Sequence, residues 1–64
     1  MNEKFIALDQ LQAGNNIQAW ADGSMRHEGT VEQTAPHLNV LWILEKGKHS
    51  RKLLESKAFS FMSC

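Results

Sequence analysis

The sequence has little cysteine, and this shortage excludes several ways of stabilising a small domain. The single cysteine, Cys64, has no partner within the chain, so an internal disulfide is excluded. No cluster of Cys and His has the spacing of a zinc finger, so we expect no metal site. The 64 residues form one domain at most, and such a chain buries only about 60% of its unfolded surface. We therefore expect an oligomer or a bound partner to supply part of the stability.

The chain has no excess of charge of either sign, since 7 Lys and Arg residues balance 7 Asp and Glu residues. A non-specific nucleic-acid binder would carry a surplus of basic residues, so any nucleic-acid site has to be a local patch. The longest apolar run, residues 40–44, is too short to cross a bilayer. Residues 1–4 are not followed by the apolar stretch of a signal peptide. Together with the lone cysteine, these features predict a cytoplasmic protein without membrane contact.

The residue patterns of common enzymes are also missing. No serine stands in the glycine-framed elbow of a hydrolase, and the 4 glycines are scattered singly, unlike those of a phosphate-binding loop. His27, His37 and His49 match neither a helical nor a finger-type pair of metal ligands. His27 falls on the inward face of an expected strand, where we interpret it as packed or hydrogen-bonded. The sequence therefore predicts a non-enzymatic binding or regulatory module without a cofactor.

The N-terminal residues 3–12 are predicted to form a short helix. Phe5, Leu8 and Leu11 recur at helical spacing. Gly14 and the two asparagines after it are a strong stop signal, because both residue types tolerate the left-handed conformation that closes a helix. A helix of this length is marginal alone, so we expect it to pack on the rest of the domain.

The remainder of the chain is predicted to form short strands. Asp22 and Gly23 separate two alternating runs and indicate a tight hairpin. Gly29 inside a strand indicates a bend or a close backbone approach, and Pro36 breaks its strand. A helix over residues 49–57 is an alternative, because good helix formers dominate there. The five expected strands are residues 17–21, 25–32, 38–44, 49–55 and 58–62.

The predicted fold is mainly β, with an N-terminal helix followed by a strongly bent, five-stranded antiparallel sheet. Short connections favour a meander that curls into a small barrel. Gly29 in the second expected strand is followed ten residues on by Asn39 at the start of the third. This spacing resembles the first motif of the Sm-like family, to which bacterial Hfq belongs, and residues 54–61 can occupy the place of its second motif. The basic and stacking residues typical of that second motif are replaced here by Glu55, Ser56 and Lys57.

The resemblance implies an SH3-like or Sm-like small barrel that binds single-stranded RNA as a homo-oligomer. In such a protein the ligand surface lies at the loops before the third strand and before the last strand. The residues of this chain at those loops are His37, Asn39 and Lys57.

Two further groups of side chains are candidates for RNA contact. Trp20 lies on the strand face opposite the small apolar residues and could stack a base, whereas Trp42, amid apolar residues, is interpreted as core or subunit interface. Clustered basic residues need no further pattern to contact phosphates. The alternative is a solvated hairpin whose lysines discourage edge-to-edge aggregation. This basic cluster comprises Lys46, Lys48, Arg51 and Lys52.

The last expected strand, residues 58–62, carries apolar side chains on both faces. An apolar terminal edge favours a homo-oligomer that pairs through this strand, as in ring-forming Sm-like proteins. The alternative is that the N-terminal helix covers it.

A second resemblance leads to another class of function. The turn at Asp22 and Gly23 and the segment from Arg51 to Phe61 are similar to features of the Rof-like Rho inhibitors. Such proteins act by binding a protein. The alternative function is therefore a protein-binding regulator of transcription or of RNA-handling machinery, of phage or mobile-element type.

Overall fold

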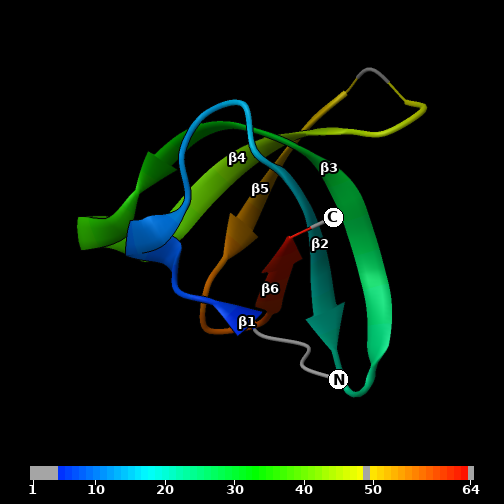
Figure 1. Ribbon diagram of the computed structural model, residues 1–64, viewed down its shortest axis with the longest axis horizontal. Helices are drawn as coiled ribbons and strands as arrows, with labels where there is room; N and C mark the ends of the chain where they lie inside the picture. The colour runs from blue at the N-terminus through cyan, green and yellow to red at the C-terminus, as the bar shows by residue number, and fades with distance from the viewer. Residues whose placement is uncertain (1–4, 49, 64) are drawn as a thin grey trace.

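The computed structural model describes residues 5–48 and 50–63, which form one open antiparallel sheet curved around the core (Figure 1). The strand order is β1-β6-β2-β3-β4-β5. A mainly β fold is therefore confirmed. The strands are β1 (Phe5–Ile6), β2 (Asn16–Ala21), β3 (Ser24–Ala35), β4 (Val40–Glu45), β5 (Arg51–Glu55) and β6 (Ser60–Ser63), and two single 3₁₀ turns are η1 (Leu8–Gln10) and η2 (Pro36–Leu38).

The helix predicted over residues 3–12 is wrong. Residues 3 and 4 lie outside the described residues, and the rest of the range forms β1, the turn η1 and an extended Leu11. β1 pairs with β6, and Leu11 enters the core, where 5% of its surface is exposed. A short isolated helix is marginal, so strand pairing and burial of Leu11 outweigh its local preference. The sheet consequently has six strands, not five.

The strands of the meander lie close to their predicted positions. Asp22 (φ 53°) and Gly23 (φ 78°) both have positive φ between β2 and β3, as a type I′ hairpin turn requires. The helical alternative for residues 49–57 is wrong, because Arg51–Glu55 is strand β5. His49 lies outside the described residues.

Gly29 permits the close approach of β3 to β4. A Cβ atom at this position would meet the carbonyl oxygen of Leu44 and lie 3.1 Å from the Cα of Glu45. The interpretation of this glycine as a site of close backbone approach is confirmed. Pro36 ends β3 and begins η2.

The core lies on the inner, concave face of the sheet. Alternation along β4 places Leu41 and Ile43 inside, each 0% exposed, and Trp42 on the outer face, where it is half-buried. Trp42 is therefore not a core residue. The buried apolar residues are Leu11, Ile17, Ala19, Val31, Leu41, Ile43, Leu54 and Phe61.

The last strand is not an edge of the sheet. β6 pairs with β2 along Ser60–Ser63 on one side and with β1 on the other, through Phe61 and Met62. The N-terminal segment therefore covers this strand, as the alternative expectation held, but it does so as a strand and not as a helix. The two edges of the sheet are β1, with 2 residues, and β5.

Candidate ligand-binding surface

The left-handed conformation of Asn39 connects η2 to the loop between β5 and β6. Asn39 has φ 60° and ψ 36°, and its backbone N–H donates to the carbonyl oxygen of Pro36 at 3.0 Å. The backbone carbonyl oxygen of Asn39 accepts a hydrogen bond from the backbone N–H of Ser56 at 2.8 Å. Asparagine is one of the few residues that adopt this conformation at low cost. The loop following β5 is thereby held against η2.

A hollow of about 160 Å³ opens where these two segments meet. Asn39 and Lys57, both predicted as ligand contacts, line it together. An amide and an ammonium group offer hydrogen-bond donors to phosphate or base oxygens. The other lining residues are Leu38, Val40 and Glu55.

A second hollow, of about 310 Å³, lies along the β5–β6 loop. Trp20 and Lys57 line it, together with Asp22 and residues of the loop. Lys57 therefore borders both hollows, one with Asn39 and the other with Trp20. Three of the predicted contact residues thus line two hollows that share the side chain of Lys57.

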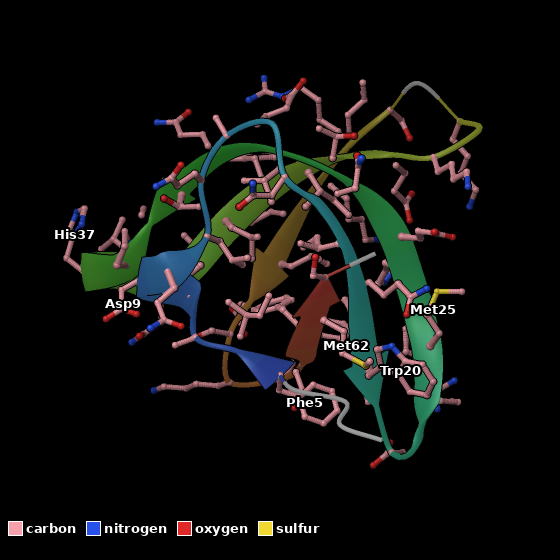
Figure 2. All side chains as sticks on the ribbon, in the orientation of Figure 1. Phe5, Asp9, Trp20, Met25, His37 and Met62 are labelled. Atoms are coloured by element: carbon pink, nitrogen blue, oxygen red, sulfur yellow. The ribbon has the colours of Figure 1, made fainter. Side chains whose placement is uncertain are left out.

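The indole of Trp20 is held on the outer face of the sheet. Its Nε1 donates a hydrogen bond to Oε1 of Gln18 at 3.0 Å, and the ring is half-buried. The strand register places Trp20 opposite Met25, and Met62 opposite both Gln18 and Phe5. Figure 2 shows Trp20, Met25 and Met62 close together, with Phe5 beside them. The outer face here is an apolar platform with one aromatic ring fixed by its neighbour.

His37 lies apart from this platform. It is exposed on η2, and Figure 2 shows it at the opposite side of the molecule from Trp20. The structure therefore brings His37 next to Asn39 along the chain but not to the hollow that contains Trp20.

The basic cluster is also distant from the β5–β6 loop. The hairpin that joins β4 to β5 lies at one end of β5, and the loop with Lys57 lies at the other (Figure 1). Lys46 Nζ lies 3.8 Å from Oε2 of Glu28. Arg51 Nε lies 2.7 Å from Oε1 of Glu32, and its guanidinium group stacks over Trp42 at 4.8 Å from the ring centroid.

The positive charges of Lys48 and Lys52 lie near a third carboxylate, that of Glu45, and help to lower its pKa. The pKa of Glu45 lies below its ordinary value, chiefly because His27 donates a hydrogen bond to it. Burial opposes this shift, and the positive charges of Lys48 and Lys52 add to it. The hairpin is therefore a mixed charged surface in which carboxylates lie near the basic side chains, not a patch of one sign.

His27 belongs to a polar cluster on the inner face. Its Nδ1 lies 2.7 Å from Oε2 of Glu45, and its ring meets the ring of Phe59 edge-on at a centroid distance of 5.4 Å. The interpretation of His27 as a packed, hydrogen-bonded residue is confirmed. Glu45 was not singled out in the sequence, because only pairing between β3 and β4 brings it to His27.

Gln18 is the other functional neighbour that the sequence did not reveal. A signal was present, since Gln18 and Trp20 are two residues apart on one strand and must share a face. Ser56 acts through its backbone, for which the sequence carries no signal.

Comparison of the chain with protein-family models, curated proteins and solved structures gives no match. The part of the chain that the structure describes has no group of three or more His, Cys, Asp or Glu residues suited to a metal ion. Within residues 5–48 and 50–63 there is also no helix with the length and apolar character needed to span a membrane. The functional inference therefore depends on the geometry around Lys57.

Proposed function

We propose that the chain is a small, non-enzymatic RNA-binding protein of the Sm-like type. Single-stranded RNA would cross the β5–β6 loop, with a base stacked on Trp20 and a phosphate bound by Lys57. The observation that carries this proposal is that Lys57 borders both hollows, one with Trp20 and the other with Asn39. The meander from β2 to β5, with Gly29 in its second strand and Asn39 before its third, and the return of β6 to the side of β2 support the resemblance to the family.

Each of these residues has a separate role in this scheme. The indole of Trp20 offers an apolar face, and stacking a base on an aromatic ring contributes about 1–3 kcal/mol. Lys57 supplies a point charge for one phosphate. Asn39 can donate and accept hydrogen bonds at a base edge. Lys46, Lys48, Arg51 and Lys52 would add weaker, longer-range attraction, because Glu28, Glu32 and Glu45 lie among them.

The test is the binding of a short, fluorescein-labelled single-stranded RNA of mixed sequence, followed by anisotropy at low salt. We expect Trp20→Ala to weaken binding by roughly tenfold or more. Lys57→Ala should weaken it and reduce the slope of log Kd against log salt by about 0.7, the value for one phosphate contact on a single strand. The matched control is Lys46→Ala on the far hairpin, which should lower the affinity less and leave the salt slope almost unchanged, because Lys46 supplies only longer-range attraction beside Glu28. Absence of binding at low salt, or binding that does not respond to salt, would refute the proposal.

A protein-binding regulator, similar in function to the Rof-like proteins, is the second candidate. The exposed apolar side chains favour it, since Phe5 and Met25 are 58% and 44% exposed beside Trp20. Apolar platforms of this kind commonly mark interaction sites. If this function is correct, a partner captured from lysate should be lost with Phe5→Ser and Met25→Ser, and retained with Leu38→Ser. Loss with all three variants, or with none, would contradict it.

A further inference from the structure

The long free edge of the sheet is β5, not the last strand. Among residues 5–48 and 50–63, β5 pairs with β4 alone, whereas β6 lies between β1 and β2 and the other edge, β1, has 2 residues. Four of the five residues of β5 are exposed, and Leu53 is 45% exposed. An unpaired strand of this kind offers its backbone groups to another strand.

The β4–β5 ladder shows which backbone groups remain unpaired. Glu45 N–H donates to the carbonyl oxygen of Ser50 at 2.9 Å, and Ser56 N–H donates to that of Asn39 at 2.8 Å. These bonds lie at the two ends of the ladder, and hydrogen-bonded pairs in an antiparallel ladder occur at every second residue. In β5, the residues that bond to β4 are therefore Lys52 and Leu54. The backbone groups of Arg51, Leu53 and Glu55 point away from β4, toward the free edge.

We propose that this edge binds a second copy of the chain, through antiparallel pairing of the two β5 strands about a two-fold axis at Leu53. In this register Leu53 lies opposite the partner's Leu53. Arg51 lies opposite the partner's Glu55, and Glu55 opposite the partner's Arg51. All the outward-pointing backbone groups of β5 then pair with those of the partner.

Charge complementarity selects this register among the possible ones. The side chains of Arg51, Leu53 and Glu55 share the outer face, because they alternate along one strand. Opposite charges directly across a strand pair are stabilising, and like charges are destabilising. A displacement by two residues in either direction would place Leu53 opposite a charged residue and separate Arg51 from the partner's Glu55. The sequence of β5 is therefore self-complementary only about Leu53.

The outward-facing side chains of β5 have neighbours on β3 and β4. Trp42 is the cross-strand neighbour of Leu53, so the dimer would carry an apolar row of Trp42, Leu53 and their two partner equivalents. In the single chain the guanidinium of Arg51 lies over Trp42 of β4, with Nε on Glu32 of β3. In the dimer this side chain would turn from Glu32 toward the partner's Glu55, and its five N–H donors allow it to bind a carboxylate there. The pairing does not depend on RNA binding.

Sedimentation equilibrium over a range of concentrations tests the proposal directly. The apparent mass of the 7.3 kDa chain should rise to that of a dimer as the protein concentration increases. We expect Glu55→Arg to raise the dimer dissociation constant by roughly tenfold or more, because it places like charges opposite each other twice. Leu53→Lys should act similarly. The matched controls are Asp9→Arg and Met25→Lys, which introduce the same charges at exposed positions of η1 and β3.

Cross-linking tests the register. In a Cys64→Ser background, Leu53→Cys should form a disulfide-linked dimer on mild oxidation, because residues in a hydrogen-bonded antiparallel pair have Cα atoms about 5.5 Å apart, within disulfide reach. Met25→Cys, at an equally exposed position on β3, should remain monomeric. A monomer at all concentrations up to about 1 mM, where even weak pairing would be detected, would overturn the proposal. So would a dimer that survives both Glu55→Arg and Leu53→Lys.

Discussion

His27 and Glu45 are joined across β3 and β4 by a contact of 2.7 Å between Nδ1 and Oε2. An ionised carboxylate can only accept, so the imidazole Nδ1–H is the donor. The two side chains are 21% and 13% exposed, and Phe59 packs edge-on against the imidazole. This contact links the middle of the sheet to the β4–β5 hairpin.

The contact makes a prediction for stability at low pH. The pKa of Glu45 is lower in the folded chain than its ordinary value, first because of the hydrogen bond from His27. A carboxyl group of this kind stabilises the fold above its unfolded pKa, and that contribution is lost as pH falls through the lowered folded pKa. We expect the free energy of unfolding, measured in urea, to fall with acidification below about pH 4.5. Glu45→Gln should flatten this decline and lower the stability at pH 7.

A control separates this contact from the general effect of removing a charge. Asp9→Asn removes an exposed carboxylate on η1, away from His27. If Asp9→Asn and Glu45→Gln change the pH profile equally, the contact with His27 does not explain it.

Gly29 should be one of the least replaceable residues of the sheet. The Cβ of Gly29→Ala would press against the backbone of Leu44, which cannot move without separating β3 from β4. We expect a loss of about 3 kcal/mol in the free energy of unfolding. Gly47→Ala is the control, because a Cβ there meets no atom within 4 Å and only its φ of 81° is unfavourable, at a cost of about 1 kcal/mol. Equal losses in chemical denaturation would contradict the steric explanation.

Asn39 combines a backbone role with a proposed ligand role, and two substitutions separate them. Asn39→Gly should retain stability, because glycine readily adopts φ 60°, whereas Asn39→Ala should lose about 1 kcal/mol. Thermal unfolding measures this difference. Both variants remove the side-chain amide, so both should weaken RNA binding in the anisotropy assay. Wild-type affinity in Asn39→Gly would show that the residue serves only the backbone.

Local patterns predicted the meander well. Alternation and the Asp22–Gly23 turn located β2 and β3, and the apolar run located β4. The prediction for the N-terminal segment was wrong, because the spacing of Phe5, Leu8 and Leu11 fits a helix and does not reveal that the segment can pair with the edge of a sheet. Of the candidate site, the sequence predicted Trp20, Asn39 and Lys57, which line the two hollows, but not the pairing of the basic hairpin with carboxylates.

The sequence by itself determined a small β domain with a tight hairpin and a close approach at Gly29, because turn chemistry and strand periodicity act between near neighbours. Only the tertiary structure decided which strand is the free edge. It placed β1 against β6 and left β5 open, and it brought Glu32 to Arg51 and Glu45 to His27. Which segment lies beside a strand depends on the free energy of burying all the core side chains together. No local sequence pattern contains that free energy.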